Sequence, residues 1–393
     1  MSKDVVIVSV ARTPIGSFLG SLSSVSAPKL GSIAIKGALD KIGLSPELVD
    51  EVLMGNVVQS GAGQAPARQA AIYAGIPDSV PCTTVNKVCA SGMKAIMLGA
   101  QSIMLGENDV VVAGGMESMS NAPHLLPPGA RGGLRNGHGK LLDHMFIDGL
   151  EDAYTGAAMG TFAQKTADEH GLTREGMDAF AIESLTRAQR AIDDGLNQKE
   201  IAPVTIRTRR GEHTVSIDEQ SHKANLEKIP QLRPAFAENG TITPANSSSI
   251  SDGASALLLA SEQAVETHGL TARARIVAHS RNSLAPEAFT LAPIGAAEDV
   301  LAKAGWAVSD VDLWEINEAF AMVTMLTMDA LKLDPSCVNV HGGACAQGHP
   351  IGSTGSRIIV TLMHALEHYG KKRGVAALCI GGGEATAVAI ELV

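Results

Sequence analysis

Short apolar runs alternate along the chain with longer stretches whose apolar positions recur at helical spacing. The apolar runs are rich in Val, Ile, Leu and Ala, as is typical of strands buried in a sheet. They occupy residues 4–10, 50–57, 109–115, 274–280, 375–383 and 385–393. The stretches between them are rich in Ala, Leu, Lys and Glu, and they predict helices. This alternation predicts an α/β protein whose helices cover its sheets.

The chain also repeats itself. Gly43 precedes Asn56 by 13 positions, and Gly305 precedes Asn317 by 12 positions in a similar segment. The two glycines lie 262 positions apart and the two asparagines 261 positions apart. One such similarity carries little weight, but a shared offset predicts a duplicated fold.

A second pair of segments has nearly the same offset. Cys89 and His349 lie 260 positions apart. Each is followed by small residues, an apolar helix, a strand and a glycine cluster. The duplication would therefore bring the thiol of Cys89 and the imidazole of His349 face to face.

The region between the two copies differs in composition. Residues 121–249 are rich in Gly, Pro, Asn and His before they become helical and then basic. Long irregular insertions are often functional loops or interfaces. We predict an N-terminal core domain of residues 1–120 and 250–271, and a C-terminal core domain of residues 272–393. The inserted loop domain, residues 121–249, is expected to bind ligand and to make oligomer contacts.

Composition narrows the classes of function. Of the 393 residues, 45% are hydrophobic and 18% are charged, which excludes a disordered chain. The net charge of −10 argues against non-specific nucleic-acid binding. Five cysteines without a CxxC pair predict neither a disulfide framework nor a metal site, and they favour a reducing compartment.

No membrane span or targeting segment is expected. Four charged residues interrupt the apolar carboxy-terminal stretch, namely Lys372, Arg373, Glu384 and Glu391. The amino terminus reads as a strand, and the final residues "IELV" are not a peroxisomal signal. We therefore expect a cytoplasmic protein.

Cys89 is the first candidate for chemistry. In "VNKVCASGMKA" it lies where a strand turns into a helix. Unpaired N–H groups at a helix amino terminus lower the pKa of a thiol and can hold an oxyanion. A buried structural cysteine is the alternative. His349, in the glycine-dense turn "QGHPIGSTGSR", would take the thiol proton and leave a reactive ion pair.

Cys379 and Asn317 are the next candidates. Cys379 precedes three glycines at the end of an apolar run, so we expect it to be exposed at the carboxyl end of a strand. Asn317, in "WEINEAFA", lies where a strand ends, and helix N-capping is the alternative to catalysis. The adjacent Glu318 is expected either to be a charge in the first turn of a helix or to support its neighbours by hydrogen bonds. Glu117 and Asp252 are expected to serve turns and packing.

Four motifs in combination resemble the thiolase family over the whole chain. They are "VNKVCASGMKA", "NEAFA", "GHPIGSTGSR" and "CIGGGEA", and their order and spacing fit as well. The resemblance is closest to the acetoacetyl-CoA thiolase branch. It implies a five-layered αβαβα thiolase fold of two duplicated core domains plus the loop domain, usually assembled as a homotetramer.

The resemblance also implies an activity. It is the reversible Claisen condensation of two acetyl-CoA to acetoacetyl-CoA and CoA, with CoA and acyl-CoA as substrates and no further cofactor. Cys89 would be the nucleophile, and His349 would activate it. His349 would also bind the enolate oxygen together with a water held by Asn317. Cys379 would be the carbon base, and the N–H groups of Cys89 and Gly381 would hold the other oxyanion.

The resemblance further implies the substrate contacts. Lys228 and the cluster Arg207, Arg209 and Arg210 are candidates near the nucleotide phosphates. The residues expected to line the pantetheine tunnel are Leu150, Met159, Phe236, Ser248, Ala319 and Phe320.

Two positions depart from the commonest bacterial pattern. Ala158 stands where many relatives have His, and Phe289 stands where several have Met. Both resemble thiolases that accept a 2-methyl branch, so the acyl pocket is expected to accept 2-methylacetoacetyl-CoA.

Three alternatives remain open from the sequence. A longer-chain 3-ketoacyl-CoA thiolase would share all four motifs. A decarboxylating ketosynthase would pair its cysteine with two histidines, against which Cys379 argues. A non-catalytic CoA-binding scaffold would be expected to have lost at least one of the four reactive side chains.

Overall fold

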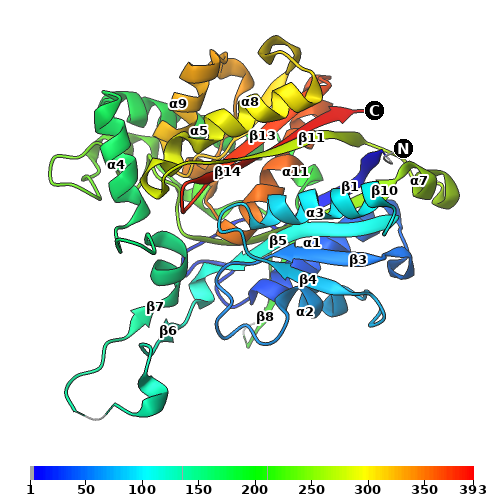
Figure 1. Ribbon diagram of the computed structural model, residues 1–393, viewed down its shortest axis with the longest axis horizontal. Coiled ribbons are helices and arrows are strands. Elements are labelled where there is room, and N and C mark those ends of the chain that lie inside the picture. The colour runs from blue at the N-terminus through cyan, green and yellow to red at the C-terminus, as the bar shows by residue number, and fades with distance from the viewer. Residues whose placement is uncertain (1–3, 135, 210) are drawn as a thin grey trace.

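One continuous sheet runs through both halves of the chain (Figure 1). The computed structural model describes residues 4–134, 136–209 and 211–393. The strand order is β12-β13-β14-β11-β1-β10-β5-β3-β4, and the short strand β2 pairs with β10. These strands are β1 (Val5–Arg12), β2 (Gly16–Ser17), β3 (Glu51–Gly55), β4 (Cys82–Val85), β5 (Val110–Ser118), β10 (Ser251–Ser261), β11 (Ala274–Ser283), β12 (Leu313–Ile316), β13 (Arg373–Ile380) and β14 (Glu384–Leu392).

The two halves of this sheet have the same connectivity. β3 pairs with β5 in parallel, as β12 pairs with β13, and the next two pairings in each half are antiparallel. The halves meet where Val6 and Ile7 of β1 lie opposite Arg275 and Ala274 of β11. The duplication predicted from the sequence is therefore seen in the strand order.

The helix ends repeat as well. α1 (Ala27–Ile42) and α8 (Ala292–Ala304) occupy corresponding places in the two halves. Gly43 ends the first with φ of 62°, and Gly305 ends the second with φ of 69°. Both glycines adopt the left-handed conformation that closes a helix without a steric penalty.

Both faces of the sheet are covered by helices, so its strands read as continuous apolar runs. In β5, Val110 and Val112 pack on one face with α1 and α2 (Pro66–Tyr73). Val111 and Ala113 pack on the other face with α3 (Ser91–Leu105) and α11 (Ile351–Tyr369).

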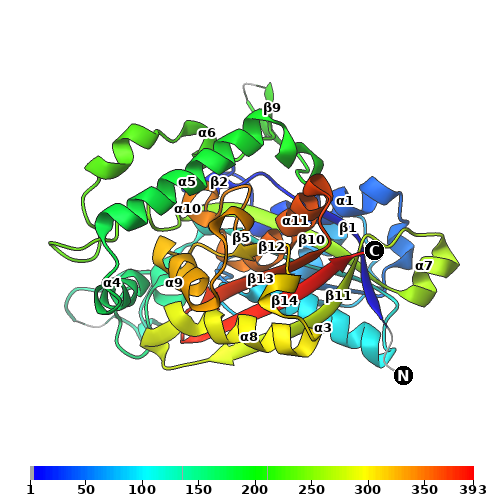
Figure 2. The same cartoon turned by 90° about the horizontal axis from the view of Figure 1, so that it is seen from above.

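The helices complete five layers (Figures 1 and 2). α1 and α2 cover the outer face of the first half, and α3 and α11 lie between the two half-sheets. α8 and the end of α9 (Ala321–Leu331) cover the outer face of the second half. The predicted αβαβα arrangement is confirmed.

The central layer holds two helices at close approach. A Cβ on Gly92 of α3 would lie 2.9 Å from the backbone nitrogen of Ser356 in α11, and a Cβ on Gly355 would lie 2.6 Å from that of Met93. The hydroxyl of Ser255 in β10 lies 2.6 Å from that of Ser356. Only glycine allows two helices to approach this closely.

The expectation that no segment is long and apolar enough to span a membrane was wrong. Residues Val88–Leu105 pass such a test of length and hydropathy, with 56% of that window buried. Because α3 lies in the central layer, the apolar character of this segment is explained by the packing of both half-sheets against it.

The middle of the chain forms a region beside the sheet. Its elements are β6 (His124–Leu125), β7 (Leu142–Asp143), α4 (Met159–Glu169), α5 (Arg174–Asp193), β8 (Val204–Thr208), β9 (Gly211–Val215) and α6 (Glu219–Lys223). Two short helices lie elsewhere, α7 (Glu262–His268) after β10 and α10 (Ala344–Gln347) before α11. The hairpin of β6 and β7 extends away from the body of the molecule (Figure 1).

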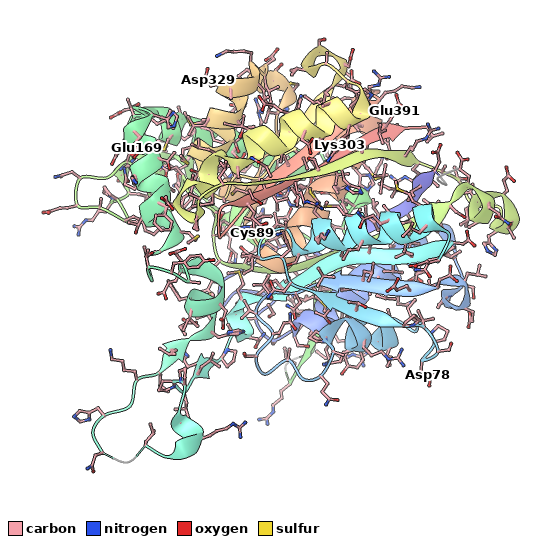
Figure 3. The ribbon with its side chains drawn as sticks, viewed as in Figure 1. Asp78, Cys89, Glu169, Lys303, Asp329 and Glu391 are labelled. Carbon is pink, nitrogen blue, oxygen red and sulfur yellow. The ribbon has the colours of Figure 1, made fainter. Side chains whose placement is uncertain are left out.

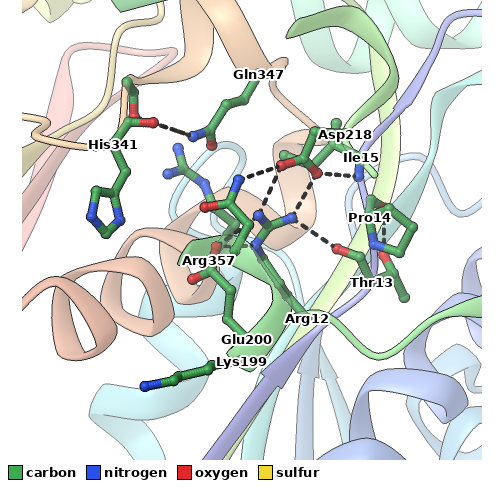
Figure 4. A network of polar contacts seen from close by, with 12 residues as sticks. Arg12, Thr13, Pro14, Ile15, Lys199, Glu200, Asp218, His341, Gln347 and Arg357 are labelled. Carbon is green, nitrogen blue, oxygen red and sulfur yellow. Dashed lines mark hydrogen bonds and ion pairs between the residues drawn. The ribbon is translucent and has the colours of Figure 1, made fainter. Parts of the chain in front are cut away.

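A buried ion-pair network ties this region to the sheet (Figure 4). The guanidinium of Arg12, in β1, lies 2.7 Å from the carboxylates of both Glu200 and Asp218. Asp218 also accepts a hydrogen bond of 2.9 Å from the N–H of Ile15. Removing one partner would leave a buried charge unpaired, so the network fixes the attachment.

The close approach of α3 and α11 generates a stability prediction. We expect Gly92→Ala to lower the free energy of unfolding by about 1–3 kcal/mol, because its methyl group would overlap α11. Urea unfolding monitored by circular dichroism measures this change. Gly132→Ala is the control, since no atom lies within 4 Å of a Cβ there. Equal stability of the two variants would contradict the prediction.

Candidate active site

A cavity of about 250 Å³ lies where the two halves and the middle region meet. The predicted site residues that line it are Cys89, His349, Cys379, Gly381, Leu150, Ala158, Met159, Phe236, Ser248, Phe289, Ala319 and Phe320. Asn317 is not among the lining residues. Residues far apart in the sequence are thus brought to one place.

Cys89 lies in the turn between β4 and α3, two residues before the helix begins (Figure 3). The hydroxyl of Ser91 accepts a hydrogen bond from Lys87 N–H at 2.8 Å and donates one to the carbonyl of Val88 at 2.7 Å. Asn86 accepts a hydrogen bond of 3.0 Å from Val88 N–H. These bonds fix the turn that presents the thiol.

The turn is strained beside the thiol. Val88 has φ of 48°, a left-handed conformation that β-branched residues rarely adopt. Such strain costs on the order of 1–3 kcal/mol and is concentrated at functional sites. The surrounding hydrogen bonds hold this conformation in place.

The expected lowering of the Cys89 pKa was wrong for the protein without bound substrate. Burial raises the pKa of the Cys89 thiol to about 11, although hydrogen bonds from the N–H groups of Gly381 and Cys89 itself lower it. The nearby carboxylate of Glu117 raises it further. Burial outweighs the two N–H groups because an apolar cavity solvates a thiolate poorly.

The surroundings of His349 determine which ring nitrogen carries the proton. Nδ1 lies 2.6 Å from the hydroxyl oxygen of Thr354, and that hydroxyl donates its own proton to the carbonyl of Pro350 at 3.1 Å. With the hydroxyl proton given to Pro350, Nδ1 is the donor to Thr354, and this tautomer leaves a lone pair on Nε2. Nε2 has no hydrogen-bond partner among the residues that the structure describes.

His349 is neutral in this environment. Burial, and then the positive charge of Arg357, lower the pKa of the imidazole to about 3. The thiol and the imidazole therefore rest in their neutral forms, and the reactive ion pair expected from the sequence is not favoured. A neutral imidazole can act on a neutral thiol as a general base, taking the proton as the sulfur attacks.

Asn317 follows β12 and is buried, with 1% of its surface exposed. It does not cap α9, which begins only at Ala321, so the N-capping alternative was wrong. Both polar atoms of its side-chain amide lack a hydrogen-bond partner within the described part of the chain. A buried amide without partners is costly and indicates a place for water or ligand.

The neighbouring carboxylate of Glu318 anchors this turn. It accepts hydrogen bonds of 2.8 Å from the side chains of Ser184 and Asn339, and one of 3.1 Å from Cys345 N–H. These bonds connect α5, the residues after β12 and α10. The supporting role expected for Glu318 agrees with this geometry.

Cys379 lies in β13 and lines the cavity, but only 1% of its surface is exposed. The expectation of an exposed thiol was wrong, because neighbouring segments cover this end of the sheet. Burial, and then the proximity of Cys89, raise the pKa of Cys379 well above its usual value. The two thiols are thus close enough to interact, and Cys379 rests as a neutral thiol.

The apolar wall of the cavity is built around three aromatic rings. Phe320 lies edge-on to Phe236 and Phe289, with ring centroids 6.1 and 6.4 Å away. Gly160 faces the ring of Phe236, which a Cβ there would displace. The rings form a continuous surface suited to a thin aliphatic chain.

Sequence reasoning missed several other lining residues. They are Met119, Phe146, Gly149, Gly160, Ser247, Ser249, Ile250 and Ile351. Gly149 directly precedes Leu150 and Gly160 directly follows Met159, and these predicted neighbours were the available signal. Met119 and Phe146 belong to irregular segments, in which the sequence does not predict the direction of a side chain.

Lys228 and Arg207, which were predicted to lie near the nucleotide phosphates, do not line this cavity. Lys228 is exposed and lines a separate pocket of about 210 Å³ with Leu185, Ala245 and Cys345. Arg207 belongs to β8 and pairs with Glu212 at 2.6 Å. Arg210 lies outside the described residues. The predicted phosphate contacts of this basic cluster stay a prediction.

The described residues contain no group of three or more His, Cys, Asp or Glu side chains able to hold a metal ion. The polar groups that line the cavity include two thiols, one imidazole and three serines, and backbone N–H groups of Cys89 and Gly381 hydrogen-bond the Cys89 thiol. This set can hold an acyl group, move a proton and stabilise an oxyanion.

Comparisons with known proteins agree with this geometry. Residues 5–263 match the model of the thiolase N-terminal domain, and residues 270–392 match that of the C-terminal domain. The chain is 50% identical to an acetyl-CoA acetyltransferase of Schizosaccharomyces pombe over 100% of both chains. It is 48% identical to the human mitochondrial acetyl-CoA acetyltransferase, covering 99% of this chain and 90% of the relative.

A solved structure matches over the whole length. The Acat5 thiolase of Ascaris suum, in complex with coenzyme A, superimposes with a TM-score of 0.94 at 43% identity, covering 100% of both chains. Both thiolase domain models match, and together they span nearly all of the sequence. The chain therefore belongs to the thiolase family.

Proposed function

We propose that this chain is an acetyl-CoA C-acetyltransferase, which condenses two acetyl-CoA to acetoacetyl-CoA and CoA and catalyses the reverse thiolysis. One observation carries the proposal, namely that Cys89, His349 and Cys379 line a single apolar cavity. The full-length similarity to acetyl-CoA acetyltransferases supports the choice of substrate.

The first half-reaction transfers an acetyl group to Cys89. As the sulfur attacks the thioester carbonyl, its proton passes to Nε2 of His349. The N–H groups of Cys89 and Gly381, which already hydrogen-bond the thiol, receive the oxyanion. Each such donor is worth about 3–4 kcal/mol. The tetrahedral intermediate then expels the CoA thiolate, which takes the proton of the Cys379 thiol and leaves as CoA. Cys379 is left as a thiolate, and Nε2 of His349 keeps the proton from Cys89.

The second half-reaction forms the carbon–carbon bond. The thiolate of Cys379 removes a proton from the methyl group of the second acetyl-CoA, and the enolate oxygen accepts hydrogen bonds from the protonated Nε2 of His349 and a water on Asn317. The carbanion attacks the acetyl group on Cys89 and expels the Cys89 thiolate, which takes the proton from Nε2 of His349. The partnerless polar atoms of His349 and Asn317 support this second oxyanion site.

The pantetheine arm and the acyl group occupy the same cavity in this proposal. Leu150, Met159, Phe236 and Ser248 contact the arm, together with Ala319 and Phe320. Lys228 and the basic residues of the β8–β9 hairpin are proposed to contact the nucleotide end. A longer-chain 3-ketoacyl-CoA thiolase would use the same groups, and chain-length profiling separates the two.

Assembly, compartment and domain division are also proposals. The hairpin of β6 and β7 exposes Leu126, Leu134 and Leu141, each to at least 60%. Exposed apolar residues on an extended hairpin favour a contact with another copy, and we propose a homotetramer, which its mass in solution would decide. We propose a cytoplasmic location and the division into residues 1–120 with 250–271, 121–249 and 272–393.

The activity is tested by CoA-dependent cleavage of acetoacetyl-CoA. We expect the purified protein to form acetyl-CoA, and Cys89→Ala to lower kcat by about three orders of magnitude or more. Cys337→Ala is the control, because that cysteine is half-buried outside the cavity. A protein that binds CoA but cleaves neither acetoacetyl-CoA nor longer 3-ketoacyl-CoA would instead be a scaffold.

The protonation states generate a pH prediction. Since the pKa of His349 is about 3, the base is present throughout the neutral range. Alkylation of Cys89 by iodoacetamide should therefore proceed readily near pH 7. In His349→Ala the reaction needs the free thiolate, so its rate should rise about tenfold per pH unit toward the Cys89 pKa of about 11. Identical pH profiles for both proteins would exclude His349 as the base.

The acyl pocket generates a substrate prediction. Ala158 lines the cavity opposite larger side chains, and its short side chain leaves room for a branch. We expect cleavage of 2-methylacetoacetyl-CoA, and Ala158→Leu should lower kcat/KM for it more than for acetoacetyl-CoA. Parallel assays of both substrates measure this ratio. Failure of the unaltered protein to cleave the branched substrate would refute the proposal.

A further inference from the structure

Glu117 is a fully buried carboxylate beside the cavity that the reaction steps above do not use. It lies in β5 with 0% of its surface exposed. The sequence assigned it only to turns and packing. Its contacts join three separate segments of the chain.

The carboxylate accepts four hydrogen bonds. Asn56 Nδ2 donates at 2.6 Å, Val57 N–H at 3.0 Å and Val58 N–H at 3.1 Å. The fourth donor is the N–H of Gly352, at 2.8 Å. A carboxylate with four donors is held firmly, because hydrogen bonds to a charged acceptor are stronger than those between neutral groups.

One of these four bonds, from the N–H of Gly352, crosses between the halves of the molecule. Gly352 lies in the first turn of α11, which begins two residues after His349. Val57 and Val58 belong to the loop after β3 and pack with Ile351, and Cys89 packs against the same cluster. Glu117 thus ties the helix that follows the imidazole to a loop beside the thiol.

Glu117 occupies the position in the first half of the fold that matches Cys379 in the second half. Asn56 follows β3 as Asn317 follows β12. Glu117 and Cys379 each lie two residues beyond the last pair of β3 with β5 and of β12 with β13. The position that holds a reactive thiol in the second half therefore holds an anchoring carboxylate in the first half.

We propose that Glu117 is a positioning residue, which sets the imidazole of His349 relative to the thiol of Cys89 by fixing the start of α11. The expected effect on the reaction rests on the proposed function, whereas the hydrogen bonds of Glu117 do not depend on it. A shift of the imidazole by about 1 Å can cost on the order of 100-fold in rate. Burial raises the pKa of Glu117 to about 7, while its N–H donors favour the carboxylate.

The test compares Glu117→Gln with the unaltered protein. Gln has the same shape, but its NH₂ group would face an N–H donor where an oxygen now accepts. We expect kcat for acetoacetyl-CoA cleavage to fall about 10- to 100-fold with KM changed less than about threefold. Alkylation of Cys89 by iodoacetamide, followed by peptide mass spectrometry, should slow in parallel.

Glu219→Gln is the matched control. That carboxylate also accepts two backbone N–H bonds, from Ser17 and Ser21, but none from α11. It should lower the thermal midpoint without changing kcat or Cys89 alkylation. Because alkylation needs no substrate, it tests the inference even if acetoacetyl-CoA is not cleaved.

Two results would overturn the inference. One is Glu117→Gln with a lower thermal midpoint but unchanged kcat and alkylation rate, which would make Glu117 merely structural. If Glu117→Gln does not fold, Glu117→Asp carries the test, since it keeps the charge but shortens its reach. A folded Glu117→Asp with unaltered kcat and alkylation would overturn the inference, whereas a slowed one would support it.

Discussion

The rest of the structure depends on the contact between the two helices of the central layer. α3 and α11 approach through Gly92 and Gly355, and no side chain separates their backbones. Because Cys89 and His349 each lie two residues before one of these helices, the packing that closes the core also brings thiol and imidazole together. The same helix contact therefore stabilises the core and sets the geometry of the site.

Burial explains how the site works at neutral pH. It raises the pKa of Cys89 and lowers that of His349, so neither group is charged before substrate enters. In the proposed reaction, charge develops only as the sulfur attacks, next to N–H groups that are already oriented. An apolar, preorganised cavity makes such donors stronger than they would be in water. The low dielectric environment therefore favours the transition state over a resting ion pair.

Much of the fold and of the candidate site could be predicted from the sequence, for reasons that differ from one feature to another. The buried strands were found because both faces of the sheet are covered, and the shared offset of Gly43 and Gly305 revealed the duplication. Cys89 was singled out because it lies where a strand turns into a helix, and His349 and Cys379 because glycine-rich turns lie beside them. The pKa of Cys89 could not be predicted, because it depends on burial by segments distant in the sequence. The four donors around Glu117 come together only in the folded chain, for the same reason.

The duplicated strand ends also bear on the history of the molecule. In an ancestor with two identical halves, the same pair of positions would have faced the central helices from both sides. In the present chain, one side carries Asn317 and Cys379, and the other carries Asn56 and Glu117. In the proposed reaction, one copy of the fold supplies the reactive thiol while the other supports it. The twofold repeat of the fold therefore does not extend to the side chains at its matching strand ends.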